Sequence, residues 1–389
     1  MATSPILRPR QTTLRRRAPG ARQTSLTLFP QAARHGNCES PSGASAPPPV
    51  PDRRTKPATE LVGIARLAAS SPRAEVKRGT EYFVLPVKSI LNECHSERVP
   101  FRWTVNPYRG CEFGCKYCYA RYTHSYMELG ASDFETKIYV KQNAGVLAER
   151  DLSHDKIWGE HIAIGAATDP YQPAEREFGA TRAILAKMAE REGLSVSITT
   201  KSDQVVRDLD LLKRISRRSS LSVNVTITTL RTQLARLLEP RAPRPDLRLA
   251  AVRRLRDEGI STGVFAMPIL PWLTDREEDL DALAGGARQA DAEWLGARVL
   301  YLMPDAWRTF LQFLERRFPR LVARYRGWYG NGADAPESYR KEMTARVERI
   351  RKKYGLNARP TSPAQGPAVW QSPQMQLALD RGEDPLCPT

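Results

Sequence analysis

Apolar stretches alternate with amphipathic ones along the middle of this 389-residue chain. Short runs rich in β-branched and aromatic residues predict strands, and apolar residues three or four positions apart predict the helices between them. The stretch 180–192 is typical of such a helix, because Ile184, Leu185 and Met188 share one face and Gly193 would end it. The strands are predicted at 101–105, 161–167, 195–200, 221–228, 260–267 and 297–302.

This alternation predicts the fold class. Six strands separated by helices are typical of an α/β protein with a parallel sheet joined by right-handed crossovers. Further helices are expected to end near Pro240, to span 246–258 and to begin at Thr274, where Glu277 would complete a capping box. A short extra strand is predicted at 82–87. Reactive groups are expected at the carboxyl ends of the six strands.

Composition divides the rest of the chain around this core. No acidic residue occurs before Glu39, and a segment so basic and proline-rich cannot bury enough apolar surface to fold. Helices are also predicted over 307–325 and 339–354, and both carry basic residues, so they form either a solvated face or a surface for nucleic acid. The predicted segments are a disordered basic tail over 1–60, an N-terminal extension over 61–100, the core over 101–305, a helical C-terminal extension over 306–356 and a flexible tail over 357–389.

Charge and cysteine content narrow the class of protein. The formal net charge of +17 favours polyanionic partners, nucleic acid among them. Six cysteines, three of them scattered, do not form a disulfide framework and fit a reducing cytosol, so a cytoplasmic location is expected. No apolar run is long enough to span a membrane, and no membrane partner is expected.

Three of the cysteines stand within eight residues, at Cys111, Cys115 and Cys118. An odd number of thiols so close together cannot pair off as disulfides. Three thiolates can bind three corners of one inorganic cluster and leave its fourth corner open, whereas structural iron–sulfur and zinc sites usually have four protein ligands. A zinc site completed by Cys94 or His95 is the alternative.

The spacing of these cysteines, with Tyr117 before the third, resembles the CxxxCxxC loop of the radical SAM superfamily. The resemblance implies a partial (β/α)6 barrel of the TIM type and a [4Fe–4S] cluster whose open iron binds S-adenosylmethionine (SAM). It also implies reductive cleavage of SAM to a 5′-deoxyadenosyl radical. An external electron donor such as flavodoxin or ferredoxin would then be a partner.

Motifs at the strand ends resemble the spore photoproduct lyase-like branch of that superfamily, in the same order over residues 80–356. They are Asn106-Pro107-Tyr108-Arg109, Thr168-Asp169-Pro170, Thr199-Thr200-Lys201, Glu239-Pro240 and Met267-Pro268. The resemblance implies that Tyr117 and Met267 lie near the adenosine. It also implies that Thr168, Lys201 and either Thr226 or Thr228 hold the carboxylate and ribose of SAM.

One position departs from the lyase pattern. The lyase has a cysteine just before the acid–hydroxyl pair after its second strand, and that cysteine donates the closing hydrogen atom. This chain has Ala166 and Ala167 there. Repair of a thymine dimer by that chemistry is therefore not expected. The resemblance makes Tyr119 a candidate for relaying the radical, and a packed buried tyrosine is the alternative interpretation.

Two functions follow from these observations. The first is a radical SAM enzyme that starts radical chemistry on an unknown substrate, with nucleic acid as the favoured class. The second is a non-catalytic iron–sulfur or zinc protein that associates with nucleic acid. The open fourth site and the matched strand ends favour the enzyme.

Overall fold

The computed structural model describes residues 60–77, 79–95 and 99–358. All of these belong to one of the two units of the chain, residues 42–389. The disordered tail predicted over 1–60 and the flexible tail predicted over 357–389 lie outside the described residues, apart from a residue or two at their boundaries.

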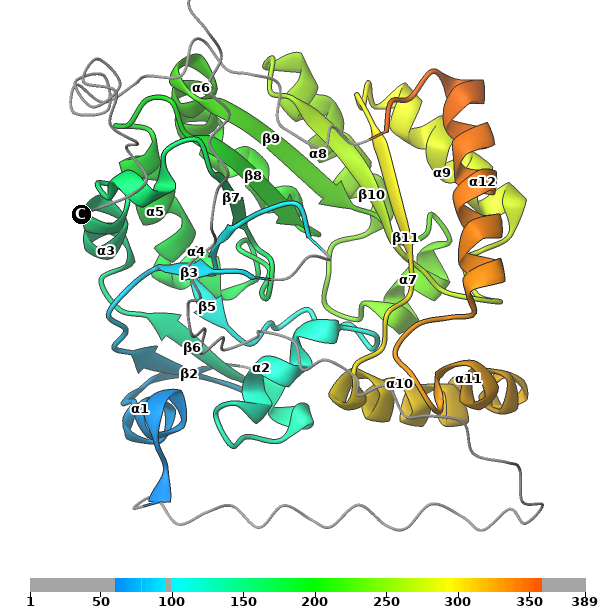
Figure 1. Cartoon of the computed structure of the whole chain (residues 1–389), viewed down its shortest axis with the longest axis horizontal. Helices are drawn as coiled ribbons and strands as arrows, with labels where there is room; N and C mark the ends of the chain where they lie inside the picture. The colour runs from blue at the N-terminus through cyan, green and yellow to red at the C-terminus, as the bar shows by residue number, and fades with distance from the viewer. Residues whose placement is uncertain (1–59, 78, 96–98, 359–389) are drawn as a thin grey trace, which may run out of the picture. The chain divides into compact units, whose positions relative to one another are not determined.

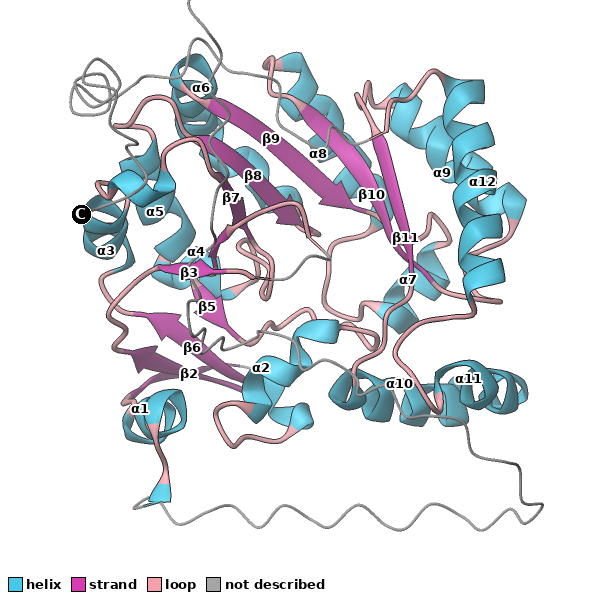
Figure 2. Cartoon of the chain, viewed as in Figure 1, coloured by secondary structure: helices cyan, strands magenta, loops and turns pink. Residues whose placement is uncertain are grey.

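The largest sheet has seven strands in the order β11-β10-β9-β8-β7-β4-β3 (Figure 2). Six of them are parallel, and β3 (Leu91–Glu93) pairs antiparallel with β4 at the edge. The parallel strands are β4 (Trp103–Val105), β7 (His161–Ile164), β8 (Ser195–Thr200), β9 (Ser220–Thr226), β10 (Thr262–Ile269) and β11 (Leu295–Val299). Each overlaps one of the six predicted strands, so the α/β fold class is confirmed.

The two faces of this sheet differ in chemistry because side chains alternate along a strand. On one face, Ile198 and Val223 are fully buried against the helices. On the other, Thr199 and Asn224 oppose each other in register, and the Asn224 amide reaches Thr199 Oγ1 at 3.5 Å. Polar and small residues on one face are typical of a barrel interior that holds ligands.

Helices connect the parallel strands and cover the apolar face (Figure 1). Helices α9 and α12 pack on each other beside β10 and β11. The helices within and after the barrel are α4 (Ala174–Phe178), α5 (Ala180–Met188), α6 (Leu209–Arg218), α7 (Thr232–Leu238), α8 (Pro245–Asp257), α9 (Glu277–Gln289), α10 (Pro304–Arg317), α11 (Val322–Tyr329) and α12 (Glu337–Tyr354).

Two details of the predicted helices are wrong. Helix α9 begins at Glu277, its N-cap is Arg276, and no side chain caps it. Thr274 lies upstream, where its hydroxyl accepts a hydrogen bond from Leu270 N at 2.8 Å, so no capping box forms. The helix expected over 307–325 is broken near Pro319, because proline cannot donate the hydrogen bond that a continuing helix needs.

A second sheet of four strands has the order β1-β2-β6-β5. Strand β2 contains most of the predicted strand at 82–87, but β6 was not predicted, because a lysine stands at each end of its five residues. The elements before the barrel or in the segment between β4 and β7 are α1 (Gly63–Ser70), β1 (Arg73–Lys77), β2 (Thr80–Leu85), β5 (Tyr108–Arg109), η2 (Tyr119–Arg121), α2 (Tyr122–Ser125), η3 (Ala131–Glu135), β6 (Lys137–Lys141), α3 (Ala144–Asp151) and η4 (Asp155–Ile157).

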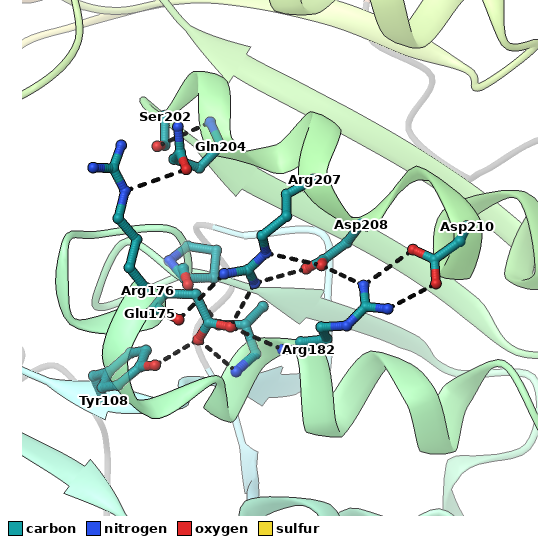
Figure 3. Close-up of polar contacts among 11 residues, drawn as sticks. Tyr108, Glu175, Arg176, Arg182, Ser202, Gln204, Arg207, Asp208 and Asp210 are labelled. Atoms are coloured by element: carbon teal, nitrogen blue, oxygen red, sulfur yellow. Dashed lines mark hydrogen bonds and ion pairs between the residues drawn. The ribbon is translucent and has the colours of Figure 1, made fainter.

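A buried polar network fixes β5 to the barrel (Figure 3). The Tyr108 hydroxyl donates to Glu175 Oε2 at 2.5 Å, and Arg207 Nη2 donates to Glu175 Oε1 at 2.8 Å. Arg207 also binds Asp208, which in turn accepts from Arg182 at 2.7 Å. These bonds hold together β5, α4, α5 and the 3₁₀ helix η5 (Asp203–Asp208). Strand β5 leads directly into the cysteine loop.

None of the helices in the described part of the chain is long and apolar enough to cross a membrane.

Candidate active site

The cysteine loop runs from β5 to η2 and is anchored at several backbone atoms. Cys111 N donates to Phe134 O at 2.9 Å, and Lys116 N donates to Leu238 O at 2.9 Å. The first bond ties the loop to η3, and the second ties it to the end of α7. Cys111 and Cys115 are each 8% exposed, whereas Cys118 is half-buried.

Gly110 makes the entry into this loop sterically feasible. Its φ of +82° lies in the left-handed region, and a Cβ there would stand 2.9 Å from the carbonyl oxygens of Phe134 and Lys137. Thr168 Oγ1 donates to the Gly110 carbonyl at 2.7 Å, and Gln172 Nε2 donates to the same oxygen at 3.1 Å. The structure therefore places Thr168 beside the loop, where its hydroxyl positions Gly110. Gln172 was not predicted as a site residue.

Asp169 joins the ends of two neighbouring strands. Its carboxylate accepts hydrogen bonds from Thr200 Oγ1 and from Lys201 N, both at 2.7 Å. Asp169, in the loop after β7, thereby fixes the backbone at Lys201.

The Lys201 ammonium lies 5.8 Å from the ring centroid of Tyr117, which stands between two of the cysteines. Within the described residues it has no hydrogen bond and no carboxylate within ion-pair distance. Burial alone would lower the pKa of Lys201, but the coulombic attraction of a Cys115 thiolate and of the Glu239 carboxylate holds it above its ordinary value. Lys201 is therefore a cation beside the loop that no side chain neutralises at close range.

Tyr117 belongs to a fully buried network that sequence analysis did not predict. Its hydroxyl lies 2.9 Å from Thr228 Oγ1 and donates to Glu239 Oε1. Thr228 Oγ1 donates to the same carboxylate oxygen at 2.8 Å. Arg248 Nη2 pairs with Glu239 Oε2 at 2.6 Å, and both side chains are 1% exposed. Glu239 stands in one of the quoted motifs, whereas Arg248 on α8 resembles the other arginines of a surface helix.

This network distinguishes the two candidate threonines, Thr226 at the end of β9 and Thr228 two residues beyond it. The Thr228 hydroxyl is occupied by Tyr117 and Glu239. The Thr226 hydroxyl, on the barrel's inner face, has no hydrogen bond to any described residue, although its carbonyl accepts from Arg248 Nη1 at 3.0 Å. Met267 lies on the same face, and its Cε is 3.2 Å from where a Cβ of Gly296 would stand. Thr226 and Met267 thus line the interior, and Thr228 braces the loop.

Tyr119 is 38% exposed and donates from its hydroxyl to the carbonyl of Ala166. Its ring stacks on Tyr122 with the centroids 6.4 Å apart. The alternative of a packed, buried tyrosine does not describe this side chain. The structure brings Tyr119 to the strand end at which the lyase pattern would place a thiol.

The donor set fits an iron–sulfur cluster. Burial raises the pKa of the Cys111 and Cys118 thiols and that of Cys115 to about 12, so a cationic partner is needed to hold all three as thiolates. Among the described residues, no three His, Cys, Asp or Glu side chains are arranged to hold a single metal ion. A cluster takes one thiolate at each corner iron, so its ligands need not converge on one point. Cys111, Cys115 and Cys118 would hold three corners.

A groove of about 960 Å³ lies against the outer side of the loop, between η3, α7 and α10. Lys116, the residue after Cys115, lines it. Three further lining residues, Arg236, Arg316 and Arg317, have no carboxylate partner among the residues that the structure describes. Exposed cations at this groove favour an acidic partner.

Known proteins resemble the chain in sequence and in fold. The profile of the radical SAM superfamily matches residues 105–284. An uncharacterised protein of Mycobacterium tuberculosis is 35% identical over 311 residues, which cover 79% of this chain and 90% of that protein. An uncharacterised protein of Methanocaldococcus jannaschii is 33% identical over 218 residues, covering 56% of this chain and 77% of that protein.

Solved structures of spore photoproduct lyase share the fold. The lyase complexed with dinucleoside spore photoproduct has a TM-score of 0.55 at 17% identity, and the match covers 71% of this chain and 80% of the lyase. A lyase mutant with bound AdoMet and dinucleoside spore photoproduct has a TM-score of 0.54 at 17% identity, covering 77% and 87%.

The superfamily match spans the cysteine loop and the strands that carry Lys201, Thr226 and Met267. The fold match extends over the barrel that positions them. Membership implies SAM and an iron–sulfur cluster as cofactors. The chain therefore belongs to the radical SAM superfamily and is a radical SAM enzyme with the fold of spore photoproduct lyase.

Proposed function

We propose that this enzyme holds a [4Fe–4S] cluster on Cys111, Cys115 and Cys118, cleaves SAM reductively and abstracts hydrogen from a nucleic-acid substrate. The observation that carries the proposal is the Lys201 ammonium, 5.8 Å from the Tyr117 ring and without an ion-pair partner in the described chain. A carboxylate such as that of SAM would complete its pairing beside the loop that holds the cluster.

When bound, the cluster and SAM supply a 5′-deoxyadenosyl radical. The chain's residues have separate tasks toward SAM. Lys201 would bind its carboxylate, Thr226 would offer a hydroxyl to the ribose, and Met267 would pack against the adenosine. Tyr117 would present a ring whose position is fixed because its hydroxyl is held by Glu239.

Two observations support nucleic acid as the substrate class. The formal net charge of +17 favours a polyanion. The lyase structures with the same fold were solved with a dinucleoside photoproduct. Thymine-dimer repair in the manner of the lyase is not proposed, because Ala166 and Ala167 carry no thiol. Tyr119, whose hydroxyl reaches the Ala166 carbonyl, is instead assigned the relay of the radical.

An external donor must supply the electron that reductive cleavage of SAM consumes. We place its docking site at the basic groove. Lys116 lines this groove, directly follows the cluster ligand Cys115 and precedes Cys118 by two residues. An acidic redox protein such as a flavodoxin would match the charges of Arg236, Arg316 and Arg317.

Anaerobic reconstitution with iron and sulfide tests the proposed function. We expect about four irons per chain for a [4Fe–4S] cluster and slow formation of 5′-deoxyadenosine from SAM after reduction. Loss of any one of the three cysteines should abolish that cleavage. Stoichiometric zinc without visible absorbance would overturn the cluster assignment. Multiple-turnover repair of spore photoproduct DNA would overturn the conclusion that a chain with alanine at 166 and 167 cannot repair it in the manner of the lyase.

A further inference from the structure

Lys141, the last residue of β6, is a buried cation that the proposed function does not use. It is only 4% exposed, and its ammonium has no hydrogen bond or ion pair with any residue that the structure describes. Its neighbour across the sheet in β2 is Leu85, which is fully buried and apolar. An ammonium held in such surroundings without an anion is costly.

Arg109 of β5 is a second unpaired cation on the same face. Strand β5 pairs antiparallel with β6 so that Arg109 opposes Tyr139 and Tyr108 opposes Val140. Lys141 is two residues beyond Tyr139, so it points to the same face as Arg109. Such diagonal neighbours are roughly 7–8 Å apart at Cα, within reach of long side chains.

The register of β5 is fixed from the opposite face. Tyr108 donates to Glu175 inside the network of Figure 3, and this bond holds the alternate side of the strand against the barrel. Arg109 must therefore point away from that network. Its guanidinium makes no hydrogen bond to a described residue, and its Nε is completely buried.

Among the described residues, no acid forms an ion pair with Arg109 or Lys141. Burial first and the Arg109 charge second lower the pKa of Lys141 to about 7, so its side chain is only partly protonated near neutral pH and a bound anion would favour the charged form. Asp151 is the acid that acts on Lys141, but its carboxylate is already occupied. It accepts from Ser89 Oγ and Ile90 N, both at 2.7 Å, and pairs with Arg150 at 2.6 Å.

We propose that Arg109 and Lys141 form a binding site for a phosphate group. A guanidinium binds two phosphate oxygens through its parallel N–H donors, and an ammonium adds a point charge. Arg109 is half-buried, so part of its side chain is exposed to solvent. Resting on the proposed function, the group is assigned to a phosphodiester of the nucleic-acid substrate, since Arg109 is two residues from Cys111 and so lies beside the cluster loop.

The test titrates inorganic phosphate into the reconstituted full-length protein and follows its thermal unfolding and its heat of binding. Phosphate should raise the unfolding temperature of the wild type in a saturable way. Lys141→Met keeps the length of the side chain and removes the charge, so affinity for phosphate should fall at least tenfold. Lys137→Met on the same strand is the matched control and should bind phosphate as the wild type does, because Lys137 is partly exposed and pairs with Asp133 at 3.4 Å.

Several outcomes would overturn the site. One is equal phosphate binding by the wild type and Lys141→Met, and another is no binding by the wild type at millimolar phosphate. Weaker binding of SAM, with phosphate binding intact, would assign the pair to the SAM carboxylate instead. Arg109→Gln should repeat the loss; if that variant does not fold, Lys141→Met alone decides.

A second titration identifies the source of the phosphate. Lys141→Met should weaken binding of a short single-stranded oligonucleotide and reduce the salt dependence of that binding. If phosphate binding is lost while oligonucleotide binding is unchanged, the phosphate belongs to a small molecule, and the nucleic-acid assignment is overturned. These titrations need neither SAM nor a reductant, so failure of SAM cleavage would count against the proposed function alone.

Discussion

At the scale of single residues, Lys201 and Glu239 show how this site combines a free charge with a fixed one. Lys201 has no ion-pair partner in the described chain and is available to a ligand. Glu239 forms an ion pair with Arg248, accepts hydrogen bonds from Tyr117 and Thr228, and positions the Tyr117 ring. Both lie beside the cysteine loop, yet their substitution should have different consequences.

Lys201→Ala should weaken SAM binding by about 1.5–3 kcal/mol, the usual contribution of a hydrogen bond to a charged group. The iron content should not change, because Lys201 makes no hydrogen bond to the loop. Isothermal titration of SAM with the reconstituted protein measures the effect. Lys187→Ala is the control, because Lys187 of α5 is partly exposed and pairs with Glu149 and Glu190. Equal affinity in Lys201→Ala and the wild type would remove Lys201 from the site.

Glu239→Gln should lower the free energy of unfolding by about 3–5 kcal/mol, because it leaves the Arg248 charge buried and unpaired. Asp257→Asn breaks the exposed Arg253–Asp257 pair and should cost less than about 1 kcal/mol. Denaturant unfolding measures both. Replacing Glu239 and Arg248 together by methionine should restore much of the stability. SAM affinity should be weaker than wild type in Glu239→Gln and in that double variant, because the Tyr117 hydroxyl has lost its carboxylate acceptor. Wild-type SAM affinity in the double variant would show that the network is only structural.

At the scale of elements, the cysteine loop is shaped by what packs around it. Gly110 stands where the chain leaves β5 and has a positive φ, and an added Cβ there would lie 2.9 Å from backbone oxygens of η3 and β6, closer than van der Waals contact allows. Thr168 and Gln172 then hold the Gly110 carbonyl from the loop after β7. The turn that leads into the three cysteines therefore requires glycine at position 110.

Gly110→Ala should therefore impair both folding and cluster binding. The left-handed conformation alone costs an alanine about 1–2 kcal/mol, and the close contacts with Phe134 O and Lys137 O add to it. Gly179→Ala is a matched control, because its φ is +59° and nothing lies within 4 Å of its added Cβ. Iron per chain and unfolding free energy should both fall further in Gly110→Ala. The same loss in both variants would mean that the contacts at Gly110 are unimportant.

At the scale of the whole molecule, the proposed substrate and the proposed electron donor would use different sides of the cysteine loop. The barrel interior carries Lys201, Thr226 and Met267, whereas the basic groove lies on the outer side, against α10. An electron donor and a substrate can then approach the loop without competing for the same surface.

Reversing the charge of the groove should weaken docking of an acidic donor. The triple variant Arg236→Glu, Arg316→Glu, Arg317→Glu should bind a flavodoxin about tenfold more weakly at low salt, a loss of about 1.4 kcal/mol. The difference from wild type should shrink as salt is added. The control triple Arg214→Glu, Arg217→Glu, Lys352→Glu changes net charge equally on exposed positions of α6 and α12. An equal loss in both triples would show that only net charge matters.

Much of the fold could be predicted from the sequence because its signals are local. Short runs of β-branched and aromatic residues located all six parallel strands, and the three cysteines define their own loop by spacing alone. Strand β6 was missed because its five residues, which begin and end with a lysine, show no clear alternation of apolar and polar positions. The capping box at Thr274 was wrong because a nearby backbone amide, Leu270 N, uses that hydroxyl instead.

The roles of individual side chains depend on contacts between segments far apart in the chain. Thr226 and Thr228 look alike in sequence. In the structure, Tyr117 and Glu239 hydrogen-bond to the Thr228 hydroxyl. The Thr226 hydroxyl has no hydrogen bond to a described residue. Arg109 and Lys141 become a pair only because β5 and β6 meet in one register, 32 residues apart in the chain. Most of the elements and the three candidate cluster ligands could be assigned from the sequence alone, since both depend on residues close together in the chain. Tertiary structure decided which polar groups are satisfied and which remain open to a ligand, since that depends on what is packed beside them.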